Sequence, residues 1–364
     1  MNTDNENLKP LRNQIDRIDS ELLRLLNERA QCAVEVGQIK GREKKEQEEI
    51  VFYRPERVAQ VLERLSKENS GPLGVEQVSA IFREIMSSCL SLEQALRVSY
   101  LGPPGTFTEA AARKQFGQSV ETLPYLSIDE VFRAVESSSV DFGVVPVENS
   151  TEGMVNLTLD CFVKSGLQIC AEIEMPIHQC LLRKVGANGD VKEILSHPQS
   201  LAQCRLWLDD QYREVPRRSV GSNAEAARLA AEDESVVAVG GQVAATQYGL
   251  SIEASNIEDN PTNKTRFLVI GRQISGVSDS DKTSILVAVN NKPGALHQVL
   301  EPFRDLEIGL SRIETRPSGT GDWSYLFFID FDGHVLDPKI KEVLSTVGDL
   351  ALNLKVLGSY PKVN

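Results

Sequence analysis

Three positively charged side chains near the start of the chain have a spacing that suits the binding of a small anion. Arg29 and Lys40 are eleven residues apart, so on an α-helix they share one face, about 16 Å apart along the axis. Long side chains converging over that gap could hold one small dianion. Arg12 would lie about 25 Å further along the same helix, so we expect any site that it serves to belong to a partner chain. Spacing alone also fits a solvated, charged helix face.

Four polar segments flank short apolar runs later in the chain. They are residues 102–108 (GPPGTFT), 146–153 (PVENSTEG), 196–199 (SHPQ) and 263–267 (NKTRF). The first opens a helix and leaves backbone N–H groups and hydroxyls for an anion, but it matches neither nucleotide-binding glycine pattern. Each segment alone could be an ordinary turn or cap, and His197 suits a hydrogen-bonded structural role better than that of a base.

The elements that must position these residues fall into three stretches. Residues 1–97 have apolar positions at helical spacing over 11–40, 55–68 and 75–96, which predicts three helices and no strand. So few residues bury little apolar surface alone, which favours an oligomer. Residues 98–272 alternate strands with helices, as in an α/β fold. Residues 275–281 read as a linker, and 283–364 have the order βαββαβ of a ferredoxin-like sandwich, with Pro293 at the first position of a helix over 293–306.

The expected α/β elements can be given by number. Strands are expected at 98–101, 142–147, 169–174, 215–220, 236–239 and 266–270, and helices at 109–116, 128–136, 223–232 and 242–248. In the C-terminal stretch, strands are expected at 283–290, 308–315, 323–331 and 352–357, and a second helix at 338–347.

The first 40 residues closely resemble the first helix of the all-helical chorismate mutases, in the run LRNQIDRIDSELLRLLNERAQCAVEVGQIK. The resemblance implies that Arg12, Arg29 and Lys40 bind the substrate, with Arg12 supplied by the other subunit of an intertwined dimer. It adds Arg57 as a substrate ligand and Glu93 as the group that hydrogen-bonds the breaking ether bond. Fixed positive charge and conformer selection would suffice for such a pericyclic rearrangement. The sequence departs from the family pattern at Arg54, Val58 and Cys89, and the acid missing at Val58 usually contacts the substrate hydroxyl.

The middle of the chain, residues 98–272, strongly resembles prephenate dehydratase, because YLGPPGTFTEAA, DFGVVPVENSTEG, SHPQ and NKTRF occur in order. The resemblance implies two α/β lobes, similar to periplasmic binding proteins, with the site in the cleft between them. It assigns catalysis to Thr265, whose hydroxyl we expect to assist departure of the substrate hydroxyl. Substrate contacts are then expected from one group of residues: Thr106, Asn149, Ser150, Thr151, Arg266 and Phe267. Arg266 would hold a carboxylate.

The C-terminal stretch resembles ACT regulatory domains in two segments. These are Gly294-Ala295-Leu296, at a strand-to-helix turn, and Glu314-Thr315-Arg316-Pro317, on the next strand. The resemblance implies that phenylalanine binds between two such domains and inhibits the dehydratase, which requires coupling between two sites.

The composition of the chain limits which partners, cofactors and cellular locations are expected. The net charge of −13 disfavours a general partner among nucleic acids or anionic membranes. The six cysteines show no metal-ligand spacing, so we read them as small buried thiols. The polar N-terminus and the absence of a long apolar run predict a cytoplasmic protein. No metal, flavin or nucleotide cofactor is expected.

Taken together, the sequence predicts a bifunctional enzyme of phenylalanine biosynthesis. It comprises an all-helical mutase domain (1–97), a two-lobed α/β dehydratase domain (98–272) and an ACT domain (283–364). We expect a homodimer, and the sequence leaves open whether dimers pair into tetramers. Two alternatives remain at this stage: a monofunctional dehydratase whose helices mainly dimerise, and a two-lobed small-molecule binding protein with an amino-acid sensor.

Overall fold

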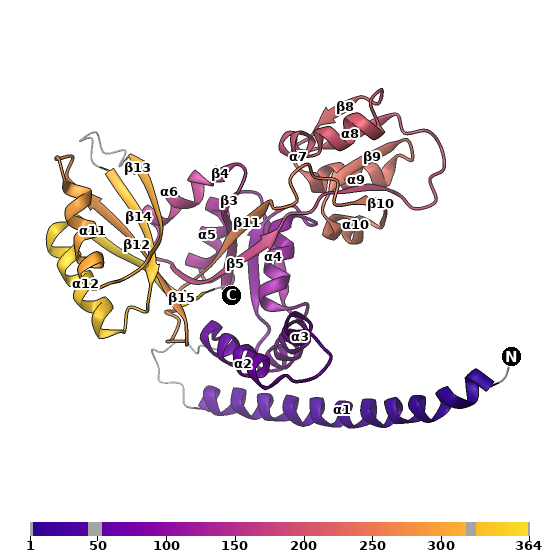
Figure 1. The fold of residues 1–364 in the computed structure, drawn as a ribbon, viewed down its shortest axis with the longest axis horizontal. Coiled ribbons are helices and arrows are strands. Elements are labelled where there is room, and N and C mark those ends of the chain that lie inside the picture. Colours follow the sequence, from indigo (N-terminus) through magenta and orange to yellow (C-terminus); the bar gives the residue numbers. More distant parts are fainter. Residues whose placement is uncertain (1–2, 43–52, 318–324, 363–364) are drawn as a thin grey trace. The chain divides into compact units, whose positions relative to one another are not determined.

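The computed structural model describes residues 3–42, 53–317 and 325–362 (Figure 1). The chain forms two compact units. The first comprises residues 1–54, 62–96 and 116–120, and the second comprises 55–61, 97–115 and 121–364.

The described part of the N-terminal stretch forms three helices and no strand before Arg97, as predicted. The helices are α1 (Thr3–Arg42), α2 (Pro55–Glu68) and α3 (Val75–Glu93). The third helix ends earlier than the predicted residue 96, because Gln94 has extended backbone angles and a strand begins at Arg97. The apolar stripe of α1 is exposed: Leu11, Ile15, Ile18, Leu22 and Leu25 are each between 46% and 57% accessible.

The first lobe of the α/β region is a mixed sheet. Its strands are β1 (Arg97–Leu101), β2 (Glu121–Tyr125), β3 (Phe142–Asn149), β4 (Gly153–Met154), β5 (Gln168–Pro176) and β11 (Lys264–Gly271). The order is β2-β1-β3-β11-β5, with β4 paired to β3. The helices are α4 (Phe107–Phe116), α5 (Ile128–Glu136) and α6 (Asn156–Lys164). The strand β11 returns from late in the sequence and lies antiparallel between β3 and β5, which brings residues far apart in the chain together.

The second lobe has its own sheet, in the order β10-β6-β9-β7-β8. Its strands are β6 (Cys180–Lys184), β7 (Glu193–Ser196), β8 (Arg217–Ser219), β9 (Val236–Gly240) and β10 (Leu250–Ser255). Its helices are α7 (Pro198–Gln203), α8 (Arg205–Gln211), α9 (Asn223–Glu232) and α10 (Gln242–Tyr248). The chain crosses between the lobes twice, after β5 and after β10. The predicted two-lobed α/β architecture is therefore confirmed.

The C-terminal sandwich (residues 281–361) is ferredoxin-like, as predicted. Its elements are β12 (Asp281–Val289), α11 (Ala295–Asp305), β13 (Leu310–Pro317), β14 (Tyr325–Asp332), α12 (Pro338–Leu350) and β15 (Asn353–Pro361). The sheet order is β13-β14-β12-β15. The predicted strand over 323–331 includes Trp323 and Ser324, which lie outside the described residues. Helices α11 and α12 cover one face of the sheet (Figure 1) and share its apolar core.

Two predictions about local structure were wrong. Pro293 does not begin the first helix of the sandwich: α11 begins at Ala295, because Gly294 adopts a left-handed conformation (φ 81°) that a helix cannot include.

The cysteines are not all buried, since Cys32 is exposed on α1 while the other five are buried. Burial raises the pKa of Cys161 and Cys170 to about 12, so both are thiols at neutral pH.

The other face of the C-terminal sandwich packs on the first lobe. One apolar core joins Leu286, Phe328 and Leu357 of the sandwich with Phe162 and Ile169 of the lobe. The strand β15 passes so near β5 that a Cβ at Gly358 would overlap the Ile169 backbone. The sandwich and the first lobe therefore form one packed body.

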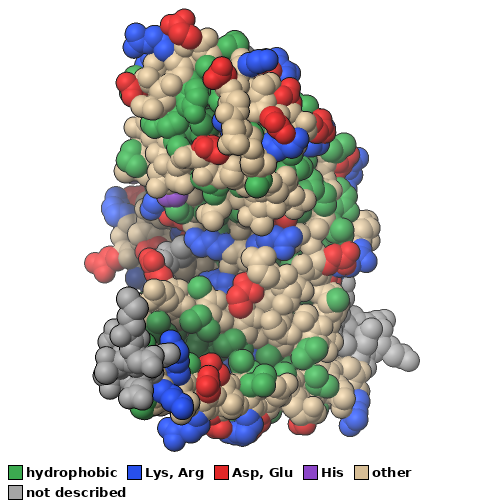
Figure 2. Space-filling view, turned by 90° about the vertical axis from the view of Figure 1, so that its right-hand side faces the viewer, with side chains coloured by type: hydrophobic (Ala, Val, Ile, Leu, Met, Phe, Trp, Pro, Cys, Tyr) green, Lys and Arg blue, Asp and Glu red, His purple; other side chains and the backbone are tan. Residues whose placement is uncertain are grey.

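The surface carries charges of both signs. Figure 2 shows acidic and basic side chains intermixed on the face drawn, so there the net charge of −13 does not gather into one acidic field. Within the described residues, no helix has the combined length and apolar character of a transmembrane span.

Candidate functional site

Four of the predicted substrate-site residues meet where β3 ends and β11 begins. Thr265 pairs with Asn149 in the β3–β11 register. The Asn149 Nδ2 donates to Thr265 Oγ1 at 2.8 Å. Ser150 is held to the same strand by two bonds, from Ser150 N to Lys264 O and from Lys264 N to Ser150 Oγ, both 2.9 Å. Thr151 follows directly, so the structure places all four residues at one edge of the sheet.

A fifth residue, Asn263, joins them. Its Oδ1 accepts hydrogen bonds from Asn149 Nδ2 at 2.9 Å and from the hydroxyls of Ser150 and Thr151 at 3.3 Å each. Asn263 lies in the segment 263–267, in which the sequence predicts roles for Thr265, Arg266 and Phe267 but none for Asn263. The available signal was its place two residues before Thr265, since alternate residues of an extended segment share a side.

The Thr106 loop lies where the two lobes meet. Thr106 Oγ1 donates to Leu101 O at 3.1 Å and accepts from Glu109 N at 3.4 Å, so the side chain caps α4. Opposite it, Tyr248 Oη of the second lobe donates to Pro104 O at 3.0 Å. At Gly105 (φ 88°) an added Cβ would lie 3.2 Å from Ala244, so the left-handed angle and the close approach both favour glycine there. Asn149, Ser150, Thr151, Asn263 and Thr265 are called the Thr265 group below, and no described hydrogen bond links Thr106 to this group.

A buried carboxylate supports this loop. Glu109 is 3% exposed. It accepts from Gly105 N at 2.7 Å and pairs with Arg113 at 2.9 Å. Burial, with the Glu109 charge as the second cause, raises the pKa of Tyr100 well above its ordinary value. Neither Glu109 nor Tyr100 was identified from the sequence.

Arg266 and Phe267 are placed differently from Thr265. The Arg266 side chain is buried, and its guanidinium donates to Glu172 at 2.9 Å and to Asp330 of the sandwich at 2.7 Å. Burial opposes the charge, but Tyr360 and the two carboxylates outweigh it and raise the pKa of Arg266. Phe267 is 1% exposed. The expected substrate contacts of Arg266 and Phe267 stay predictions, and in this structure Arg266 joins the lobe to the sandwich.

The His197 segment has the structural role expected from the sequence. His197 is the N-cap of α7, and its Nδ1 accepts from Gln199 N at 3.4 Å. Ser196 at the end of β7 donates to Val239 O at 2.6 Å. These bonds position the segment at the carboxyl ends of strands β7 and β9.

In the first unit, the structure brings two predicted mutase residues together, Lys40 and Glu93; Arg57 belongs to the second unit. Lys40 Nζ lies 3.4 Å from Glu93 Oε2, and a Cβ at Gly37 would lie 3.4 Å from Glu93 Cα, so α1 and α3 approach closely at this point. Arg12 and Arg29 lie further along α1, and Arg57 lies in the first turns of α2. The roles of these side chains in substrate binding stay predictions.

The predicted effector residues occupy two elements of the sandwich. Gly294, Ala295 and Leu296 form the start of α11, and Glu314, Thr315, Arg316 and Pro317 lie on the edge strand β13. From β13, Arg316 binds Asp160 of α6 with contacts of 2.6 and 2.7 Å. Arg312, on the same strand, forms an ion pair with Glu148, the residue before Asn149.

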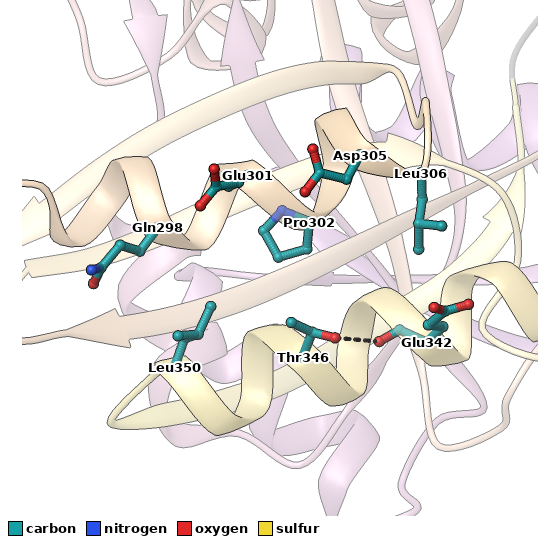
Figure 3. Close-up of a pocket in the computed structure, with 8 residues that line it drawn as sticks. All are labelled: Gln298, Glu301, Pro302, Asp305, Leu306, Glu342, Thr346 and Leu350. Atoms are coloured by element: carbon teal, nitrogen blue, oxygen red, sulfur yellow. Dashed lines mark hydrogen bonds between the residues drawn. The ribbon is translucent and has the colours of Figure 1, made fainter.

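A groove of about 400 Å³ lies on the helical face of the sandwich. Figure 3 shows Glu301 and Asp305 of α11 and Glu342 of α12 around it. Three carboxylates would repel a dianionic substrate, and none of the predicted site residues lines the groove. It is therefore separate from the candidate sites.

Comparisons with known proteins agree with this division. Family models match in three segments: Chorismate mutase type II over residues 11–94, Prephenate dehydratase over 98–275 and ACT domain over 283–349. A bifunctional chorismate mutase/prephenate dehydratase from Pseudomonas aeruginosa is 53% identical over 99% of both chains. One from Aquifex aeolicus is 44% identical over 98% of both. The crystal structure of a prephenate dehydratase in complex with L-Phe from Arthrobacter aurescens is also similar, with a TM-score of 0.68 at 33% identity, covering 73% of this chain and 90% of that one.

The mutase match and the full-length relatives favour the bifunctional reading over a monofunctional dehydratase or a binding protein. The enzyme rearranges chorismate to prephenate and then decarboxylates and dehydrates prephenate to phenylpyruvate. The chain belongs to the bifunctional chorismate mutase/prephenate dehydratase family.

Proposed function

We propose that Thr265 is the catalytic residue of the dehydratase and that its hydroxyl donates a hydrogen bond to the departing hydroxyl of prephenate. The observation that carries this is the contact from Asn149. Because Asn149 Nδ2 donates to Thr265 Oγ1 at 2.8 Å, one lone pair of that oxygen is occupied and its hydrogen remains available to another acceptor.

The chemistry suits such a donor. The bond to the lost carboxylate breaks, its electron pair enters the ring, and the ring C–O bond breaks, so that CO₂ leaves and the departing hydroxide becomes water on gaining a proton. Negative charge grows on the departing oxygen, and a fixed donor there stabilises the transition state more than the ground state. Ser150 and Thr151, on the same edge, supply the further hydroxyls that we propose contact the anion.

The test compares three variants at one loop. Thr265→Ala should lower kcat for prephenate by about 100- to 1000-fold, the scale of losing one preorganised donor. Thr265→Ser keeps the hydroxyl and should retain much of the activity. Thr262→Ala is the matched control, because its exposed hydroxyl bonds only to Asn260 among described partners. An unchanged thermal unfolding transition in the same samples reports an intact dehydratase domain. Full dehydratase activity in Thr265→Ala would remove Thr265 from the chemistry.

For the mutase we propose a site built from Arg29, Lys40, Arg57 and Glu93 of one chain with Arg12 of a second. Two features support a dimer. The exposed apolar stripe of α1 offers a contact surface, and such a stripe is costly to leave in water. Arg12 lies too far from Lys40 along one straight helix for a small ligand to span. We place the enzyme in the cytoplasm, as its biosynthetic relatives suggest.

We also propose that phenylalanine binds the ACT domain at the start of α11 and at β13 and inhibits the dehydratase. The contacts of β13 support this, because they reach the dehydratase directly. Arg312 pairs with Glu148, next to Asn149, and Arg316 pairs with Asp160 of α6. An effector that shifts β13 would therefore act on the strand end that carries the Thr265 group, which provides the coupling between two sites that feedback requires.

A further inference from the structure

Asn263 stands at the point where the second crossover between the lobes enters β11. Its side chain is 2% exposed, and its backbone is held by two bonds: Asn263 N donates to Asn260 O at 3.3 Å, and Ile177 N of the first crossover donates to Asn263 O at 2.9 Å. These backbone bonds do not depend on the side chain. Replacing the side chain therefore leaves the local path of the chain supported.

The side-chain oxygen of Asn263 is the common acceptor for three consecutive residues. Asn149, Ser150 and Thr151 all donate to it, at 2.9, 3.3 and 3.3 Å. This is the residue run in which the sequence predicts substrate contacts. One buried oxygen thus fixes the orientation of three side chains at the candidate site.

The orientation of the two amides follows from the hydrogen-bond network. Asn149 Oδ1 accepts from the backbone N–H groups of Thr151 and Glu152, at 3.0 and 3.1 Å. Its Nδ2 must then face the other way, where one hydrogen reaches Asn263 Oδ1 and the other reaches Thr265 Oγ1. Asn263 must present its oxygen to this donor, because two NH₂ groups cannot bond to each other.

That orientation leaves a polar group unsatisfied. Asn263 Nδ2 is buried and has no hydrogen-bond partner among the described residues. Buried donors without a partner are rare and disfavoured in folded proteins. The chain therefore tolerates an unfavourable group in order to keep an acceptor facing Asn149. Such an arrangement is typical of a site where geometry matters for the reaction.

We propose that Asn263 is a positioning residue of the dehydratase. It holds the Asn149 amide so that Nδ2 occupies a lone pair of Thr265, and the Thr265 hydrogen is thereby left pointing to the substrate. The inference rests on the proposed role of Thr265 and goes beyond it, because it names the residue on which the direction of that hydroxyl depends.

The experiment is a double-mutant cycle of Asn263→Ala and Thr265→Ala, with kcat and KM for prephenate measured at high enzyme concentration. Asn263→Ala should lower kcat by about 10- to 100-fold, as expected when a reacting group is misplaced, and should change KM less than threefold. In the presence of Thr265→Ala, the same change should lower kcat less than twofold further, because residues that act through one another are not additive. Asn263→Asp keeps an oxygen facing the three donors and should recover most of kcat.

The matched control is Asn260→Ala, in the same loop. The Asn260 side chain is exposed and accepts from Thr262 N and Thr262 Oγ1, away from the Thr265 group. It should change kcat less than twofold. An unchanged thermal unfolding transition of the dehydratase domain in every sample reports that this domain is folded.

Each outcome decides the inference. Equal losses of kcat from Asn263→Ala with and without Thr265→Ala would show a purely structural role and overturn it. An unchanged kcat with a raised KM would make Asn263 a substrate ligand and also overturn it, while leaving the role of Thr265 intact. Normal kcat in Thr265→Ala would instead overturn the proposed catalytic residue, and the inference with it.

Discussion

A buried cluster of charges at the junction of the dehydratase and ACT domains offers the sharpest prediction about stability. Arg266 and Lys282 contribute two positive charges, and Glu172 and Asp330 two negative ones, so the cluster is balanced. The Asp330 carboxylate accepts from Arg266 at 2.7 Å and from Ser284 at 2.6 Å. The substitution Asp330→Asn keeps the shape of this side chain but removes its charge.

The size of the expected stability loss follows from the burial of these charged side chains. Asp330 and Arg266 are each 7% exposed and Glu172 is 5% exposed. Removing one partner from a buried ion pair leaves an uncompensated charge and costs about 3–5 kcal/mol. In a body of 150–250 residues each kcal/mol shifts Tm by about 2–4 °C, so the transition that contains the ACT domain should fall by about 6–20 °C.

Differential scanning calorimetry of the full chain provides the measurement. The control is Glu193→Gln, which removes one carboxylate from the exposed pair with Arg218 at 2.9 Å. Surface pairs contribute about 0–1 kcal/mol, so this Tm should move by no more than about 4 °C. The double variant Arg266→Met/Asp330→Asn restores the charge balance and should recover part of the loss. If Asp330→Asn lowers Tm no more than Glu193→Gln does, the cluster does not hold the two domains together and our reading is refuted.

Three further predictions concern regulation and the mutase. Glu314→Ala and Gly294→Val should each weaken the inhibition of phenylpyruvate formation by phenylalanine without lowering the uninhibited rate. Gly294→Val acts because valine is strained at φ 81°. Full inhibition in both variants would place the effector elsewhere. Mixing an Arg12→Ala chain with an Arg29→Ala chain should regenerate mutase activity, since one site of the mixed dimer carries both defects and the other neither; no gain despite proven heterodimers would mean that one chain builds each site. Val58→Glu should raise kcat/KM for chorismate severalfold or more, because an unpaired substrate hydroxyl forfeits about 1–3 kcal/mol; an unchanged rate would show that this contact has been misplaced.

Much of the fold could be predicted because local signals and tertiary packing agree. The helices α5 and α9 begin and end at the predicted residues, and in each a serine N-cap accepts from the N3 backbone, Ser127 from Glu130 N and Ser222 from Glu225 N. The strands β2, β4, β6 and β10 and the helices α6, α7 and α8 were not predicted. Each of them spans nine residues or fewer, so its sequence pattern is weak, and the pairing partners of the strands are set by the tertiary fold.

The sequence predicted which residues form the candidate dehydratase site better than it predicted how the strands arrange them. The motif residues 149–151 and Thr265 meet as the sequence implied, because β11 returns beside β3. We expected this strand to begin at residue 266, with Thr265 in a loop before it. It begins at Lys264, so Thr265 and Arg266 are neighbours within one strand and their side chains point to opposite sides. Sequence alone could not decide this, because the position of the strand's first residue depends on pairing with β3 and β5.

The two sides of β11 suggest how the proposed catalytic residue and the proposed effector site could be coupled through one strand. On one side, Asn263 and Thr265 meet Asn149 at the proposed dehydratase site. On the other, Arg266 is fixed to Asp330 of the ACT domain. A strand moves as a unit, because its hydrogen bonds to both neighbours hold its backbone. A shift of the ACT domain that moves Arg266 would therefore also move Thr265, the adjacent residue. Coupling between the effector site and the reaction would then need no pathway longer than this part of the strand.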